Sequence, residues 1–139
     1  MSLVFAASAY PAGRLQDRIG AKPLLLLGLV VLIAADLFLA FGQTLLGTFL
    51  GIALWGLHMG LTQGVLAALV AASAPSRLRG TAFGLFGLVT GLFALIASVL
   101  AGVLWTAIGP AATFAAGAGF AAAAFLAFLL LREDRAAPA

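Results

Sequence analysis

The sequence predicts an all-α, polytopic membrane protein with four full transmembrane helices and the end of a preceding helix. Three observations support this fold class. Hydrophobic residues make up 65% of the 139 residues and charged residues only 8%, whereas soluble domains carry about 25% charged residues. Four apolar stretches each reach the length of about 20 residues that a helix needs to cross a bilayer. The cations are confined to short segments outside these stretches.

The elements follow in order along the chain. Residues 1–10 are apolar but too short to span a bilayer, so we expect them to be the end of a truncated transmembrane helix. Residues 11–23 are predicted to form a cytoplasmic loop, residues 73–80 a second one and residues 132–139 a cytoplasmic tail. Transmembrane helices are predicted over residues 24–42, 45–72, 81–108 and 111–131.

The charge pattern predicts the orientation of these helices. Arg14, Arg18 and Lys22 precede the first full span, a second basic cluster at 77–79 separates the second and third spans, and a third at 132–135 follows the fourth. The other two breaks carry no charge. Cytoplasmic loops are rich in Lys and Arg, so both ends are expected in the cytoplasm. The expected location is a bacterial cytoplasmic (inner) membrane, with the lipid bilayer as partner and no nucleic acid.

A dense charge cluster lies just before the first full span. It reads G-x-L-x-D-R-x-G-x-K, and its fixed positions are Gly13, Leu15, Asp17, Arg18, Gly20 and Lys22. This spacing, followed by an apolar run, resembles the cytoplasmic-loop motif of the major facilitator superfamily of secondary transporters. The alternative is a positively flanked loop of the kind that precedes many membrane helices. That alternative does not require the acidic residue or the two glycines at these places.

A second motif strengthens the resemblance. Pro75, Arg79 and Gly80 form the pattern P-x-x-x-R-G, which resembles the loop between helices ten and eleven of the same superfamily. Residues 78–89 and 97–105 resemble bacterial drug-efflux-like or uncharacterised members. That branch commonly has an Asp where Ala72 or Ser73 stands, and an Asp-Arg pair at positions 106–107. Their absence here puts in doubt the charge contacts at these helix ends.

The resemblance implies a position within a larger fold. The chain is similar to the C-terminal part of a transporter, from the end of helix eight through helix twelve, which is a partial half-bundle; the N-terminal half is the alternative. The implied function is secondary active transport of an unidentified small-molecule substrate by alternating access. The chain alone is expected to be inactive and to need a missing N-terminal half or other copies of itself. In the family, the acidic residue at position 17 contacts a helix of the opposite half. A small homo-oligomeric transporter and a non-transporting membrane interaction module are the alternatives.

Two ionisable residues, Asp36 and His58, lie inside predicted spans, where such groups are costly and often functional. Asp36 is the candidate intramembrane acid, with either a packing role near the interface or a substrate or proton role. His58 shares a helix face with Trp55 and Thr62 by its spacing. Together with Gln63 they form a candidate substrate cavity, because the family's helix ten lines the central cavity. The alternative for His58 is a hydrogen bond to a neighbouring helix.

Glycine rows mark possible helix–helix contacts, since small residues let membrane helices approach closely. The candidate packing positions are Gly56, Gly60 and Gly64 in the second span and Gly84, Gly87 and Gly91 in the third. The rows fit either tight packing or sliding of helices during transport.

The residue types for enzymatic chemistry are scarce. The chain has no cysteine and one histidine, which excludes the usual metal clusters. No Ser/His/Asp arrangement and no phosphate-binding loop is present. The sequence therefore predicts a protein that is not an enzyme and needs no cofactor or metal.

Overall fold

The computed structural model describes residues 2–42 and 44–130, and all regular elements within these ranges are helical. The chain forms α1 (Ser2–Ile19), α2 (Ala21–Phe41), α3 (Leu45–Ala72), a short 3-10 helix η1 (Ser76–Leu78), α4 (Arg79–Ala107) and α5 (Pro110–Leu130). Four segments are long and apolar enough to cross a membrane: Ala21–Phe41, Leu45–Ala72, Ser76–Ala107 and Pro110–Leu130. The predicted all-α membrane fold is confirmed. The predicted tail at 132–139 lies outside the described residues.

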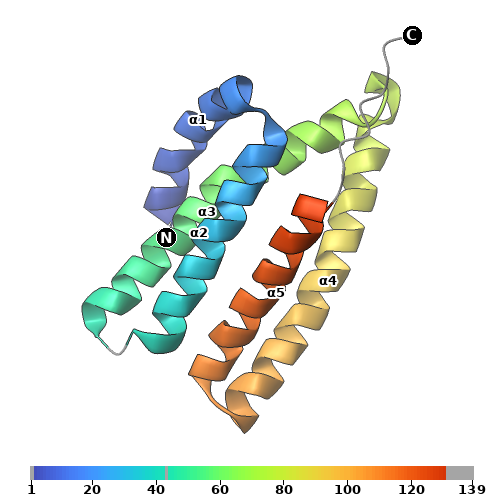
Figure 1. The fold of residues 1–139 in the computed structure, drawn as a ribbon. Helices are drawn as coiled ribbons and strands as arrows, with labels where there is room; N and C mark the ends of the chain where they lie inside the picture. The colour runs from blue at the N-terminus through green and yellow to red at the C-terminus, as the bar shows by residue number, and fades with distance from the viewer. Residues whose placement is uncertain (1, 43, 131–139) are drawn as a thin grey trace.

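The helices form two hairpins, α2–α3 and α4–α5, and α5 packs against α2 (Figure 1). The α1–α2 and α3–α4 junctions lie at one end of the bundle, and the α2–α3 and α4–α5 turns lie at the opposite end (Figure 1). Arg18 and Lys22 flank the first junction, and at the second Arg77 lies within η1 and Arg79 begins α4. The cations of the described loops therefore gather at one end, as the alternation of charged and uncharged breaks requires.

The largest difference from the sequence prediction lies at residues 11–19. A loop was expected over 11–23, but α1 continues through Pro11 to Ile19, and only Gly20 separates it from α2. Ala12 is buried and Leu15 packs against the same core cluster, so burial of this face favours a continuing helix. Gly20 makes the turn with φ of 85°, a conformation that is unfavourable for residues with a Cβ.

The other junctions use local capping. Thr44 caps α3, because its hydroxyl oxygen accepts a 3.1 Å hydrogen bond from the backbone N–H of Gly47. At the α4–α5 turn, Gly109 has φ of 122°, and the rings of Trp105 and Phe114 meet edge-to-face with centroids 6.2 Å apart. At the α3–α4 junction, the predicted loop 73–80 is shorter in the structure, because Arg79 already begins α4.

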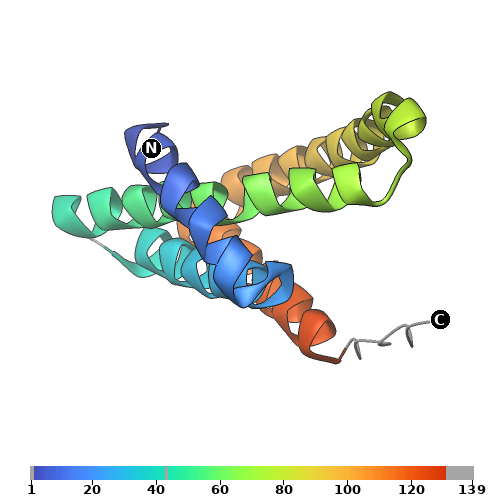
Figure 2. The same cartoon turned by 90° about the horizontal axis from the view of Figure 1, so that it is seen from above.

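The core lies where α1, α2 and α3 meet. Leu24 and Val65 are fully buried there, together with Leu25, Leu61 and Ala12. By contrast α4, which is described over its whole length, contains no buried residue. Figure 2 shows the first half of α4 diverging from the last half of α5. This chain therefore buries residues of α1, α2 and α3 against one another, whereas α4 contacts its neighbours without burying any residue.

Candidate functional site: a polar seam between α2, α3 and α5

Asp36 of α2 is the most buried charged residue among those described, with 5% of its surface exposed. Its carboxylate is hydrogen-bonded to the side chain of Trp55 on α3. An indole N–H can only donate, so Trp55 is the donor and the carboxylate the acceptor. Gly117 of α5 lies against the same group, because a Cβ at this glycine would be 2.8 Å from Asp36 Oδ2. Three helices therefore meet at one carboxyl group.

His58 makes a second link between α2 and α3. Its Nδ1 lies 2.8 Å from the carbonyl oxygen of Gly28. A carbonyl can only accept, so Nδ1 carries a proton and donates this hydrogen bond. Of the two roles left open by the sequence, the structure shows the hydrogen bond to the neighbouring helix.

Gly28 allows this close approach. A Cβ there would collide with Cγ2 of Thr62 and would lie 3.7 Å from Nδ1 of His58. Thr62 is itself buried, and its hydroxyl donates a 2.9 Å hydrogen bond to the backbone carbonyl of His58. The hydroxyl is thus already engaged within α3. We name this group the polar seam: Asp36, Trp55, His58 and Thr62, with Gly28 and Gly117.

The structure places the four residues of the predicted substrate cavity on different faces of α3, and their binding of a substrate stays a prediction. Trp55, His58 and Thr62 all face α2, through Asp36 or Gly28. Gln63 is exposed on another face of α3. The Trp55 side chain, the Thr62 hydroxyl and Nδ1 of His58 each bind a protein partner. None of these three residues lines either of the two hollows described below. Sequence reasoning missed Gly28 and Gly117, because a lone glycine in an apolar helix carries no signal of its partner.

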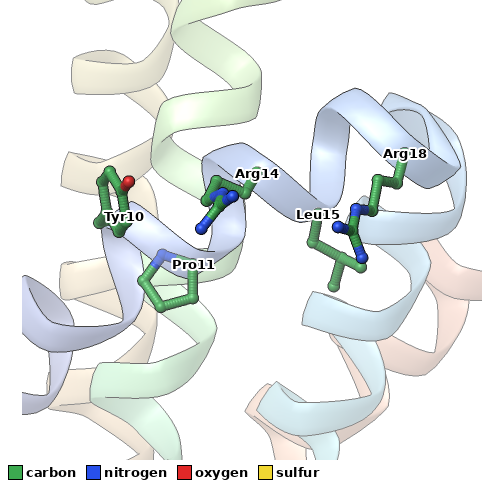
Figure 3. Close-up of a pocket in the computed structure, with 5 residues that line it drawn as sticks. All are labelled: Tyr10, Pro11, Arg14, Leu15 and Arg18. Carbon is green, nitrogen blue, oxygen red and sulfur yellow. The ribbon is translucent and has the colours of Figure 1, made fainter.

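The residues of the first motif gather at the end of the bundle that carries the cations. Tyr10, Pro11, Arg14, Leu15 and Arg18 line a shallow hollow on α1 (Figure 3). The guanidinium carbon of Arg14 lies 6.0 Å from the ring centroid of Tyr10, within the range of a cation–π contact. Asp17 and Gly13 are exposed, and Lys22 is half-buried in the first turn of α2. The motif thus forms a polar, accessible surface at the α1–α2 junction.

A second hollow lies between α1 and α3, and it is lined in part by Gln16, Gly60 and Gly64. Gly60 is buried, and a Cβ there would collide with the hydroxyl of Ser8. Gly56 is also buried, while a Cβ at Gly64 would meet no atom within 4 Å. The first two glycines of this row therefore pack inside the chain.

The glycines of α4 behave differently. Gly84, Gly87 and Gly91 are exposed, and a Cβ at each would meet no atom within 4 Å. Pro75, Arg79 and Gly80 of the second motif are also exposed. In the described part of the chain, this glycine row therefore has no helix packed against it.

The sequence was also compared with known families and proteins. The family model described as Major Facilitator Superfamily matches residues 1–139, which is the whole chain. The chain belongs to the major facilitator superfamily. An uncharacterized MFS-type transporter of Methanocaldococcus jannaschii is 36% identical over 116 residues, covering 84% of this chain and 29% of that protein. No solved structure matches the chain.

Membership of the major facilitator superfamily agrees with the four membrane-length helices, and it identifies the chain as an integral membrane protein of a transporter family. The chain spans less than a third of the length of the archaeal relative.

Proposed function

We propose that this chain forms part of a secondary active transporter that moves a small solute by alternating access. Family membership and the archaeal MFS-type relative support transport in general. Alternating access in such folds takes place between repeats or half-bundles that rock around a site near the membrane midplane. A site of that kind needs helices on both of its sides, and this chain supplies one set.

The uncovered α4 is the observation that carries the proposal. Membrane helices associate through close packing of small residues, and the glycine row of α4 is open along Gly84, Gly87 and Gly91. We infer that further helices cover this row, supplied either by an N-terminal half or by other copies of the chain. Without these further helices the chain is inactive as a transporter.

The orientation is part of the same proposal. The described cations of the two junctions lie at one end of the bundle, and positive loops face the cytoplasm. The motif residues around Asp17 would then face the cytoplasm of a bacterial cell. There, Asp17 is available to a helix N-terminus of the missing half, where a carboxylate is stabilising by about 0.3–1 kcal/mol.

Complementation tests the proposal. Three samples would be compared. The first contains the chain alone, the second contains the archaeal relative lacking its matching 116-residue segment, and the third contains both. Collapse of a respiratory pH gradient in everted vesicles would be followed after adding each member of a small-solute panel. The proposal predicts solute-dependent collapse only when both parts are present. Robust transport by the purified chain alone would contradict the requirement for a second half.

A second candidate is a non-transporting membrane interaction module, favoured by the fact that the seam's polar groups are engaged inside the protein. It predicts that His58→Ala, Thr62→Ala and Asp17→Ala leave transport by the complemented pair unchanged while the two parts still co-purify. Loss of transport in His58→Ala with retained co-purification favours the transporter instead.

A further inference from the structure

The carboxyl group of Asp36 on α2 lies against both α3 and α5. It is buried, it accepts a hydrogen bond from Trp55 and it touches Gly117. Neither the packing of the core around Leu24 nor the link between His58 and Gly28 uses this group. A carboxyl group exists as a neutral acid or as an anion, and these two forms differ greatly in their tolerance of burial.

We propose that Asp36 is a proton-binding site whose protonation state controls how closely α5 packs on the α2–α3 hairpin. The proposal concerns the helices of this chain alone and does not depend on the transport proposed above. The step is the binding of one proton from water to the carboxylate, which gives the neutral carboxylic acid.

The contact with α5 explains why the two forms pack differently. On the α5 side, the carboxyl group meets Gly117, whose side chain is a hydrogen atom and offers no donor. An anion at this place keeps one hydrogen bond, from Trp55, and an uncompensated charge in hydrocarbon is costly. The neutral acid can remain buried against α5. The anion is better solvated when α5 moves away and water enters, so the contact should loosen when the proton leaves.

Other ionisable groups on the packed helices lie elsewhere. His58 faces Gly28 rather than Asp36. Residues 110–130 of α5 include no ionisable side chain. Arg14, Asp17 and Arg18 belong to the cationic end, as do Lys22 at the start of α2 and Arg79 at the start of α4. Lys22 precedes Asp36 by 14 residues, or about 21 Å along a helix at 1.5 Å per residue.

Tryptophan fluorescence tests the proton site in the full chain reconstituted in lipid nanodiscs. The chain has two tryptophans, so Trp105→Phe leaves Trp55 as the single reporter beside the carboxyl group. The emission of Trp55 should titrate in one transition as pH rises from acid to neutral. The transition should be lost in Asp36→Asn and retained in His58→Gln. A Trp55 emission that does not titrate, or one that still titrates in Asp36→Asn, overturns the proton site.

A distance measurement tests the coupling to α5. The chain has no cysteine, so spin labels can be placed at exposed positions of α2 and α5 through Leu27→Cys and Leu126→Cys. The distance between the labels should be longer at neutral than at acid pH, and the pH dependence should vanish in Asp36→Asn. A distance that is independent of pH, or one that changes equally in Asp36→Asn, overturns the coupling.

Two neighbouring glycines of α5 provide a matched pair for the same measurement. A Cβ at Gly117 would press on the Asp36 carboxyl group, whereas a Cβ at Gly119 would meet nothing within 4 Å. Gly117→Ala should lengthen the distance already at acid pH and shift the midpoint of the Trp55 titration. Gly119→Ala should leave both unchanged. Equal behaviour of the two variants contradicts a packed contact at Asp36.

Discussion

The Nδ1 nitrogen of His58 lies 2.8 Å from the carbonyl oxygen of Gly28, thirty residues earlier in the chain. This bond joins α3 to a backbone carbonyl of α2. A carbonyl inside a helix accepts a backbone hydrogen bond, so the Gly28 oxygen accepts from His58 with its second lone pair. The bond to His58 fixes the rotation of α3 relative to α2. The two helices therefore pack with a defined register as well as through their apolar surfaces.

Replacing His58 by phenylalanine should weaken the α2–α3 hairpin. The loss of a hydrogen bond between membrane helices costs about 0.6 kcal/mol on average and at most about 1.7 kcal/mol. The free energy of unfolding, measured by titration with SDS in mixed micelles, should fall by that amount. Gln63→Leu on the exposed face of the same helix should leave it unchanged, and an equal loss in both variants would contradict a specific bond.

Replacing Gly28 by alanine should destabilise the same contact more strongly. The new Cβ would collide with Thr62 Cγ2, and overpacking of this kind costs about 1–3 kcal/mol. Gly64→Ala in α3 is the control, because a Cβ there meets nothing within 4 Å. Alanine favours a helix over glycine by about 1 kcal/mol, so the control should be neutral or slightly stabilising in the same SDS titration. A Gly28→Ala variant as stable as the control would show that the two helices are not this close.

Replacing a glycine by leucine should lower the free energy of unfolding of the chain in α3 but not in α4. Gly60→Leu should disrupt the packing of α1 on α3, because a Cβ there already collides with Ser8, and the free energy of unfolding of the chain should fall. Gly84→Leu should leave the free energy of unfolding of the chain alone unchanged, since α4 is open at this position. It should instead weaken co-purification with the truncated archaeal relative or with tagged copies of the chain.

Removal of the α3 cap should have a modest effect on stability. Thr44→Ala loses the hydrogen bond from the Gly47 N–H to the threonine hydroxyl, and loss of such a cap costs about 1 kcal/mol. Thr44→Ser retains the hydroxyl and should restore the unfolding free energy measured for the unmodified chain. A Thr44→Ser variant as unstable as Thr44→Ala would contradict the capping role.

The sequence predicts the helices of this chain well because hydrophobic length is a local property. The predicted span 45–72 coincides with α3, and the other predicted spans begin within three residues of α2, α4 and α5. The prediction of a loop at 11–23 was wrong for residues 11–19, because Pro11 and Gly13 suggest a break while burial of Ala12 and Leu15 favours a helix. Tertiary packing determines the helical conformation of residues 11–19, and this packing cannot be predicted from the local sequence.

The candidate site could be predicted only in part. The spacing of Trp55, His58 and Thr62 places them on one face of α3, but their partners depend on how α2 and α5 are rotated about their axes. No spacing rule relates Asp36 to Trp55 or to Gly117, which is 81 positions later. In sequence, the glycine row of α4 also resembles that of α3, although only the row of α3 packs against other helices in the described part of this chain. Only the arrangement of helices distinguishes the two.

The proposed membrane layout places every described cationic junction on the cytoplasmic side, and cysteine accessibility in intact cells tests it most directly. The chain has no cysteine, so single substitutions at Thr44, in the uncharged α2–α3 turn, and at Ser76, in the α3–α4 junction, report on opposite ends of the bundle. A membrane-impermeant maleimide is predicted to label Thr44→Cys in intact cells and Ser76→Cys only after the membrane is permeabilised. Labelling of both positions from the same side would contradict the layout and the orientation proposed for the transporter.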